Sequence, residues 1–287
     1  MTSTSNRTGL DRRTFITGVA ATGLLVACGG SDPEPVLEAD SFLLVQRFPA
    51  GVSTPGEIRL PFSIVDSRAE FINDGPAELR ARVTDLDGNL LGEPLVASRR
   101  DVSPSSYYAF RTVIDTPGFY ALIVEGGPID GANFQVIDPS EVTIPVPGDP
   151  LPGFDTPTPG DPGGIDPICT RDPACDFHAT TLSDALSSGP AVAYFVGTPA
   201  FCATGSCTPA LEALVEVAPD FANDFVVVHA EVYADTTARS LAPAIEALGI
   251  TFEPALFITD ADGVIVERLD GLWNTTELRE RLAVHSA

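Results

Sequence analysis

The stretch that decides the fold of the C-terminal half is residues 191–219, AVAYFVGTPAFCATGSCTPALEALVEVAP. Its first part, Ala191 to Gly197, is continuously apolar, which is typical of a strand that is covered on both faces. Thr208-Pro209 has the form of a helix start, because Thr is a good N-cap residue and Pro is tolerated in the first helical turn. We therefore expect a buried strand, a short loop with two cysteines, and a helix that continues to about Pro219.

The segments around this stretch alternate between helical and strand patterns. Such alternation predicts βαβ units and a partly parallel sheet. The expected elements are a helix over 181–188, a strand over 225–232, a helix over 238–248, strands over 255–259 and 264–269, and a helix over 275–284. From residue 191 onward, the predicted order is β-α-β-α-β-β-α.

The N-terminal half has a different pattern. Between residues 41 and 137, short segments of strand character are separated by turn residues, and none has the length and period of a helix. Glu78 to Val83 alternates polar and apolar residues, and Asp87-Gly88 is a hairpin signal. These patterns predict a small all-β sandwich of immunoglobulin-like type that serves as a spacer or docking surface. The expected strands cover residues 42–48, 57–65, 78–84, 107–114, 119–124 and 133–137.

A linker joins the two halves. Residues 138–167 contain nine Pro and five Gly, a composition that sustains neither a helix nor a central strand. We expect this segment to run semi-extended and to lie partly over the α/β domain that follows, which covers residues 168–287.

The first 28 residues have the composition of an export signal. Three arginines precede an apolar stretch that ends at Cys28. Arg12-Arg13 resembles a twin-arginine signal, and Leu25 to Cys28 resembles a bacterial lipobox, whose cysteine is acylated. These resemblances imply a signal over 1–28, a tether over 29–40, and a mature chain that is extracytoplasmic and lipid-anchored to the cell membrane. The alternative is a cleaved secretory signal with an unmodified cysteine.

The charge balance and the length of the apolar runs each exclude one class of protein. The chain has 16 Arg, no Lys and 40 Asp and Glu, which gives a formal net charge of −24. A surface this acidic repels phosphate backbones, so we expect no nucleic-acid partner. No apolar run reaches the roughly 18–20 residues that span a bilayer.

The cysteine pair suggests a family. The predicted element order, the pair directly after the first long buried strand, and Pro254 before a later strand together resemble thioredoxin-like proteins over residues 168–287. The resemblance implies a thioredoxin fold in which Cys202 is the attacking thiol, Cys207 is the resolving thiol, and Pro254 is a cis-proline beside them. The helix dipole alone favours Cys207 as the reactive thiol, because it is nearer the expected helix start.

The spacing of the pair departs from that family, since four residues separate Cys202 and Cys207 where two are usual. Residues five apart on a regular helix have Cα atoms about 8.6 Å apart, which is too far for a disulfide. We therefore expect both cysteines to lie in the loop before the helix, with Gly205 able to form a tight turn.

A second local pair, Cys169 and Cys175, precedes the first helix. The four cysteines of this half permit three pairings, and the choice that is closest in sequence joins Cys202 to Cys207 and Cys169 to Cys175. The second bond would be a structural disulfide at the entrance of the domain. The competing interpretation is a metal site made by Cys169, Cys175 and His178, because thiolate and imidazole ligands suit Cu(I) or Zn, although their spacing matches no standard site.

The thioredoxin-like resemblance also implies a buried carboxylate on the strand that leads to the cysteines. Here that strand has no ionisable group except Tyr194. His229, on the next buried strand, is an alternative base, or it is a core histidine with no role in the chemistry.

These features predict an extracytoplasmic thiol–disulfide oxidoreductase that acts on thiols and disulfides of exported proteins, with an unidentified redox partner and no cofactor. One alternative is a thiol peroxidase similar to bacterioferritin-comigratory peroxiredoxins, which also have four residues between their cysteines. The arginine that polarises peroxide has no obvious counterpart here, so only Arg239 or Arg268 can be nominated. The other alternative is a non-enzymatic copper chaperone or scaffold lipoprotein.

Overall fold

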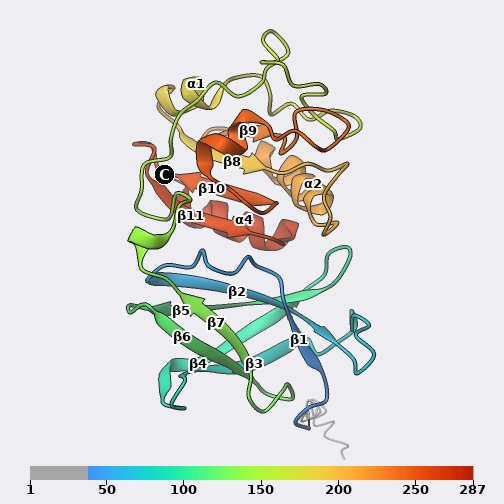
Figure 1. The fold of residues 1–287 in the computed structure, drawn as a ribbon, viewed down its shortest axis with the longest axis vertical. Helices are drawn as coiled ribbons and strands as arrows, with labels where there is room; N and C mark the ends of the chain where they lie inside the picture. Colours follow the sequence, from blue (N-terminus) through green and yellow to red (C-terminus); the bar gives the residue numbers. More distant parts are fainter. Residues whose placement is uncertain (1–37, 287) are drawn as a thin grey trace, which may run out of the picture. The chain divides into compact units, whose positions relative to one another are not determined.

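The computed structural model describes residues 38–286. The predicted signal, Cys28 and most of the predicted tether lie outside these residues. Within them, no helix has both the length and the apolar character that crossing a membrane requires. The described chain contains a seven-stranded antiparallel sheet and a four-stranded mixed sheet (Figure 1).

The N-terminal half forms the seven-stranded sheet, in the order β1-β2-β5-β4-β3-β6-β7. The strands are β1 (Leu43–Gln46), β2 (Gly56–Val65), β3 (Glu78–Asp85), β4 (Leu90–Arg100), β5 (Tyr107–Ile114), β6 (Gly118–Val124) and β7 (Ala132–Val136). Their inward side chains enclose one hydrophobic core, which includes Leu60, Phe110 and Leu122. Because β4 pairs with both β3 and β5, the strands form one continuous series. The immunoglobulin-like type therefore stays a prediction.

The six strands expected from the sequence are present, but β4 was missed. Only Ala97 among the 11 residues of β4 is buried, and the sequence of the strand, LLGEPLVASRR, does not alternate polar and apolar residues. The register shifts between Ala81 and Val83 of β3, opposite the part of β4 that contains Pro94. A proline is tolerated in a sheet at such an irregularity, where its missing N–H breaks no ladder hydrogen bond.

The C-terminal half forms the second sheet, in the order β11-β10-β8-β9, with β8 parallel to β9 and the other neighbours antiparallel. Its elements are α1 (Leu182–Ser187), β8 (Ala191–Val196), α2 (Cys207–Val217), β9 (Phe225–Ala230), α3 (Pro243–Leu248), β10 (Ala255–Thr259), β11 (Ile265–Asp270) and α4 (Thr275–His285). Short 3-10 turns cover Pro139–Glu141 and Ala218–Phe221. The predicted order of strands and helices in this half is confirmed.

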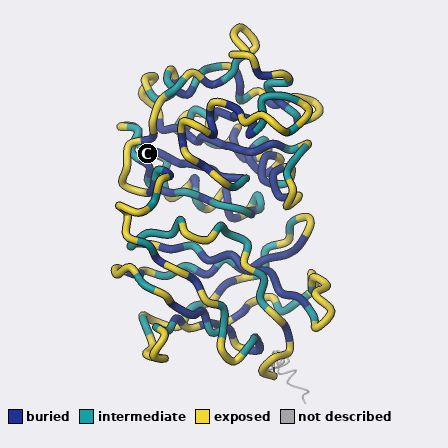
Figure 2. The backbone as a smooth tube through the Cα atoms, viewed as in Figure 1, coloured by how far each residue is buried: buried dark blue, intermediate teal, exposed yellow. Residues whose placement is uncertain are grey.

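Helices cover both faces of this second sheet. Val192 and Tyr194 of β8 belong to the core that contains α1 and α3, whereas Ala193 and Phe195 pack with α2 and α4. Every residue of β8 is buried, and the strand lies in the dark blue centre of this half (Figure 2). This arrangement confirms that the apolar run seen in the sequence is a strand covered on both faces.

The proline-rich segment 138–167 packs on the C-terminal half. It exchanges two backbone hydrogen bonds with Ile265 of β11: Gly148 N–H donates to the Ile265 carbonyl at 2.8 Å, and Ile265 N–H donates to the Asp149 carbonyl at 2.9 Å. Leu151 is buried in the core formed with α1 and α3. The predicted linker is thus attached to an edge strand of the second sheet.

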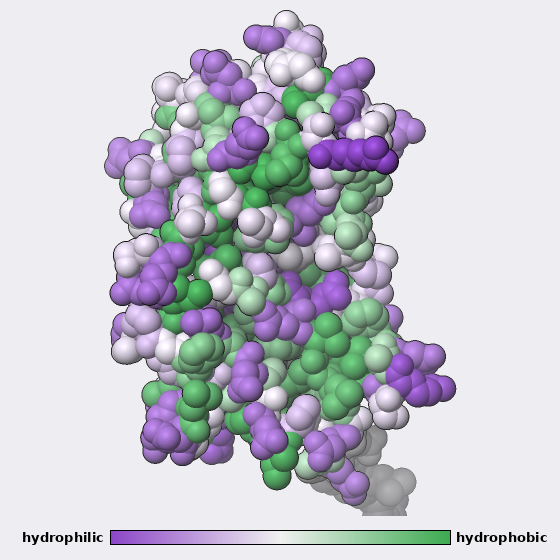
Figure 3. Space-filling view, viewed as in Figure 1, coloured by the Kyte–Doolittle hydropathy of each residue, from purple (hydrophilic) through white to green (hydrophobic). Residues whose placement is uncertain are grey.

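The surface has a mixed character on the face shown in Figure 3. Hydrophilic residues are spread across that face, with apolar residues between them. The net charge of −24 shows that acidic side chains outnumber basic ones in the sequence.

Candidate functional site

Cys202 lies in the loop that follows β8, whereas Cys207 is the first residue of α2. The expectation that both cysteines precede the helix is therefore wrong for Cys207. The loop turns back directly after the strand, because the N–H groups of Phe201 and Cys202 donate to the Thr198 carbonyl at 3.2 and 3.0 Å. A second turn follows, in which Gly205 N–H donates to the Cys202 carbonyl at 3.1 Å and Gly205 has a φ of +68°. Glycine adopts this conformation without steric cost. The tight turn expected at Gly205 is present.

Helix α2 begins at Cys207, before the start predicted at Thr208-Pro209. The Ser206 carbonyl accepts a hydrogen bond from Ala210 N–H at 3.1 Å, so the first helical hydrogen bond already encloses Cys207. Thr208, the expected N-cap, donates its hydroxyl to the Pro199 carbonyl at 3.2 Å instead. The Cys207 N–H is therefore one of the helix-start donors that has no partner within the helix.

That N–H group contacts the sulfur of Cys202. The distance from Cys207 N to Cys202 Sγ is 3.3 Å, and the Thr204 hydroxyl oxygen lies 3.2 Å from the same sulfur. The neighbouring Cys207 thiol is the main cause that lowers the pKa of Cys202, to about 5, and Thr204 and the Cys207 N–H lower it further. Donors of this kind stabilise a thiolate, so Cys202 is ionised at neutral pH.

The two sulfurs differ sharply in their environment. Cys202 is partly exposed, whereas Cys207 is fully buried. Burial is the main factor that raises the pKa of Cys207, and the neighbouring Cys202 and Glu253 raise it further. Although Cys207 is nearer the start of α2, accessibility and charge both favour Cys202 as the attacking thiol.

Glu253 is the carboxylate of this site. Its Oε2 accepts a hydrogen bond from Thr198 N–H at 2.7 Å and lies 3.3 Å from Cys207 Sγ, which donates to it. Burial raises the pKa of Glu253 to about 7. A carboxyl that ionises near neutral pH beside a buried thiol is placed to accept the proton of that thiol. The Glu253 oxygen and the two sulfurs lie within 4.8 Å of one another, so the group also has the spacing of a three-ligand metal site.

The sequence pattern predicts no carboxylate on β8 and does not single out Glu253. The available signal was an acidic residue directly before Pro254. The Glu253–Pro254 peptide bond is cis. A Cβ added to Gly197 would lie 3.3 Å from the ring of Pro254, which places that proline against the start of the loop that carries Cys202.

His229, the base suggested from the sequence, lies beside the other cysteine pair. Its Nδ1 is 3.4 Å from Cys175 Sγ and 4.0 Å from Cys169 Sγ. Its Nε2 is 2.9 Å from the Gly197 carbonyl oxygen. The histidine is thus engaged away from Cys207, whose carboxylate neighbour is Glu253.

Cys169 and Cys175 lie close together, as their short spacing suggests. Their sulfurs are 3.7 Å apart, and both are free thiols in this structure. The structural disulfide therefore stays a prediction. His178 completes this group, since its ring centroid lies 4.7 Å from that of His229.

The arginines considered for a peroxidase lie elsewhere. Arg268 donates to Asp270 and to the carbonyls of Pro145 and Val52, and its side chain is almost wholly buried. Arg239 is exposed in the segment before α3. Within residues 38–286, no hydrogen bond joins either arginine to the loop that carries Cys202.

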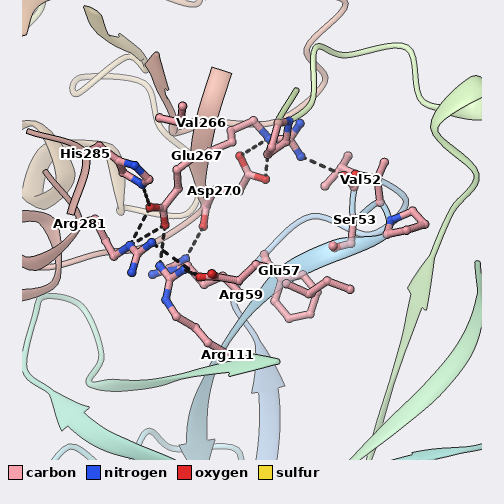
Figure 4. Close-up of a pocket in the computed structure, with 17 residues that line it drawn as sticks. Val52, Ser53, Glu57, Arg59, Arg111, Val266, Glu267, Asp270, Arg281 and His285 are labelled. Atoms are coloured by element: carbon pink, nitrogen blue, oxygen red, sulfur yellow. Dashed lines mark hydrogen bonds and ion pairs between the residues drawn. The ribbon is translucent and has the colours of Figure 1, made fainter. Parts of the chain in front are cut away.

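Two of the hollows in the described chain differ in their position relative to these residues. A groove of about 230 Å³ is lined by Thr204, Ser206, Glu253 and residues 46–49, among others. A second cavity, of about 360 Å³, contains most of the paired charges shown in Figure 4. The first hollow adjoins the cysteine loop, so it offers space for a bound chain next to Thr204 and Glu253.

The charged cavity of Figure 4 has a structural role. Glu267 accepts hydrogen bonds from Arg111, Arg281 and His285. Burial alone raises the pKa of Glu267, but the bond from His285 and the charges of the two arginines outweigh it and lower the pKa to about 2. Because these groups already bind one another, we do not take this cavity as the functional site.

Comparisons with known proteins do not indicate a function for this chain. No protein-family model matches the chain, and a search of the curated proteins finds no match to it. The choice of function therefore depends on the thiols and on the groups that contact them.

Proposed function

We propose that this chain is an exported, lipid-anchored thiol–disulfide oxidoreductase of thioredoxin-like type, with Cys202 and Cys207 as its redox pair. One observation carries the proposal: an accessible Cys202 of lowered pKa lies beside a buried Cys207 that contacts the carboxyl of Glu253. The β-α-β-α-β-β-α order around the pair supports the thioredoxin-like type. The exported and lipid-anchored part of the proposal is supported only by the sequence of residues 1–28.

In the reducing direction, the Cys202 thiolate attacks one sulfur of a substrate disulfide. A bond forms between Cys202 Sγ and that sulfur, the substrate S–S bond breaks, and the released substrate thiolate takes a proton from solvent. The Cys207 thiol then gives its proton to the Glu253 carboxylate. Its thiolate attacks Cys202 Sγ and displaces the second substrate thiolate. Two electrons pass to the substrate, and a dithiol partner must reduce the Cys202–Cys207 disulfide again.

Glu253 makes the second step possible. A thiol as buried as Cys207 resists ionisation, because its thiolate would lose the solvation of water. The carboxylate 3.3 Å away accepts the proton without exposing the sulfur. In the oxidising direction the same carboxyl returns the proton when Cys207 leaves as a thiolate.

The test is to trap the mixed disulfide. Insulin is added to the reduced Cys207→Ser chain in a Cys28→Ser background, and adducts are separated without reductant and mapped by mass spectrometry. We expect insulin to be bound through Cys202, whereas the chain with native Cys207 reduces insulin and releases it. The matched control Ala203→Ser, which adds a serine to the same exposed loop, should behave as the chain with both cysteines.

Two results would contradict the proposal. One is the absence of both adduct and insulin reduction. The other is rapid peroxide consumption by a dithiol chain that leaves insulin oxidised, which would assign a peroxidase. An adduct formed through Cys207 in the Cys202→Ser chain would reverse the assigned roles.

A further inference from the structure

A second cluster of metal-ligating side chains lies outside the proposed redox pair. Cys169, Cys175 and His178 come from the loop before α1, and His229 comes from β9. They are 8, 8, 3 and 0% exposed, so all four are buried. One ligand atom from each lies within 4.8 Å of the others.

The spacing of these atoms fits one tetrahedral ion. Zinc binds sulfur at about 2.3 Å and imidazole nitrogen at about 2.0–2.1 Å, so a tetrahedron has S–S edges of about 3.8 Å and S–N edges of about 3.6 Å. In the structure, the two sulfurs are 3.7 Å apart, and His229 Nδ1 lies 3.4 and 4.0 Å from them. Three of the edges are therefore already close to those of a zinc site.

The hydrogen bond of His229 sets its tautomer. Its Nε2 lies 2.9 Å from the Gly197 carbonyl oxygen, which can only accept, so the proton must be on Nε2. In the neutral ring, the lone pair of Nδ1 then points toward the two sulfurs. Histidines that bind metals almost always donate their other N–H to a carbonyl or carboxylate in this way.

His178 provides an independent observation. Its side chain is buried, yet neither of its ring nitrogens has a hydrogen-bond partner within residues 38–286. Burying an unpartnered polar nitrogen destabilises the folded state, so such a group needs a ligand. A metal ion in contact with His178 and its three neighbours would supply one.

We propose that Cys169, Cys175, His178 and His229 bind one Zn²⁺ ion in a closed tetrahedral site. Two cysteine thiols lose their protons to solvent when the ion binds, and the two thiolates neutralise its charge. Cu(I) would leave a net negative charge in the same buried space, where an uncompensated charge is unfavourable.

The site has no open position, because the protein fills all four. Such a closed site is structural rather than catalytic. It would hold residues 169–178 against two points of the loop that leads to Cys202: the Gly197 carbonyl, which binds His229, and Ala200 N–H, which donates to Thr170 Oγ1 at 3.2 Å. The ion would thus keep the redox loop in place without taking part in its chemistry.

The test uses the full chain with Cys28, Cys202 and Cys207 replaced by Ser, so that Cys169 and Cys175 are its only thiols. The reduced chain is titrated with Zn²⁺ and, separately, with Co²⁺. We expect one equivalent of each to bind, with the visible bands of tetrahedral Co²⁺ and a thiolate-to-metal charge-transfer band. His178→Asn should weaken zinc binding by at least about tenfold, since even lost outer contacts cost about 10–100-fold.

The matched control is His285→Asn, because His285 lies on α4 and binds Glu267. It should leave zinc binding unchanged. The proposal is overturned if the reduced chain binds no zinc, if His178→Asn and His285→Asn bind equally well, or if Cu(I) binds while zinc does not. If the purified chain contains a Cys169–Cys175 disulfide and still binds no zinc after that bond is reduced, the result favours a structural disulfide instead of a metal site. Because Cys202 and Cys207 are absent here, the outcome is independent of insulin reduction.

Discussion

The two cysteine pairs place the same residue type in opposite surroundings. Cys202 is partly exposed, receives hydrogen bonds, and has a buried partner that contacts a carboxyl group. Cys169 and Cys175 are both buried and lie beside imidazole rings. A nearby proton acceptor suits disulfide exchange, whereas nitrogen lone pairs that converge on two buried sulfurs suit metal coordination. The contacts of a cysteine, rather than its spacing from the next one, therefore indicate its chemistry.

The largest expected difference between the pairs is in alkylation. With iodoacetamide under native, metal-free conditions, Cys202 should react at least about a thousandfold faster than Cys169 or Cys175. Buried thiols react only after local opening, which in a core costs several kcal/mol, and about 4 kcal/mol corresponds to this factor. Peptide mapping of the alkylated sites measures the ratio. Equal rates at Cys175 and Cys202 would remove the contrast.

The next effect concerns proton transfer at Glu253. Because the carboxyl must be ionised to accept the Cys207 proton, release of reduced insulin should speed up as the pH rises through about 7. Glu253→Gln should lose this rise and release product about a hundredfold more slowly above that pH. Stopped-flow measurement of product release gives the profile. Glu246→Gln, on the exposed face of α3, is the control, and a profile shared by both variants would exclude Glu253 as the base.

The same carboxyl should affect stability in a direction that sharpens the comparison. Its folded pKa of about 7 lies above that of an unfolded chain, so its stabilising contribution is complete below about pH 4.5 and is lost as the pH rises through 7. The difference in free energy of unfolding between Glu253→Gln and the native chain should therefore change by about 1–2 kcal/mol in favour of the variant between pH 5 and pH 8, after allowance for partial exposure. Urea unfolding of both chains at each pH measures this gain. A difference that does not change with pH would mean that Glu253 titrates as an ordinary carboxyl.

The smallest effect is expected at Thr204. Its hydroxyl lies 3.2 Å from Cys202 Sγ, and Thr204→Val removes one donor to the thiolate. The pKa of Cys202 should rise by roughly one unit, because a hydrogen bond to a charged group contributes about 1.5–3 kcal/mol and water replaces part of it. Thiolate absorbance in the ultraviolet follows this titration. Thr237→Val is the control, because the Thr237 hydroxyl binds only Asp235 within the described chain, and it should leave the pKa of Cys202 unchanged. An equal shift of that pKa in both variants would mean that the loss of the Thr204 contact is not its cause.

Much of the fold was predictable because its signals are local. The apolar run of β8, the proline and glycine content of residues 138–167 and the alternation of β3 each identify their elements from neighbouring residues alone. Strand β4 was not predictable in this way, because its side chains are mostly exposed and Pro94 interrupts it. Its place is set by β3 and β5, which pair with it from distant parts of the chain.

The candidate site was likewise predictable only where its sequence signals are local. Each cysteine pair was visible as a short spacing, and the turn at Gly205 followed from the geometry of the loop. The side chains that contact the sulfurs could not be predicted in this way, because Glu253 is 46 residues from Cys207 and His229 is 54 residues from Cys175. Such contacts depend on which ends of the strands are adjacent in the sheet, and no local pattern carries that information. The sequence alone therefore suggested His229 as the base and gave no reason to choose Glu253.

The hydrogen bonds between the proline-rich segment and β11 bear on how the protein behaves when many copies are crowded together. An open edge strand offers free N–H and carbonyl groups that can recruit a strand from another molecule and start aggregation. At Ile265 both groups are already occupied by Gly148 and Asp149. The covering segment is itself a poor template, since each proline lacks the N–H that a further strand would need. The connector thus leaves no free ladder group at Ile265 with which a strand of another molecule could pair.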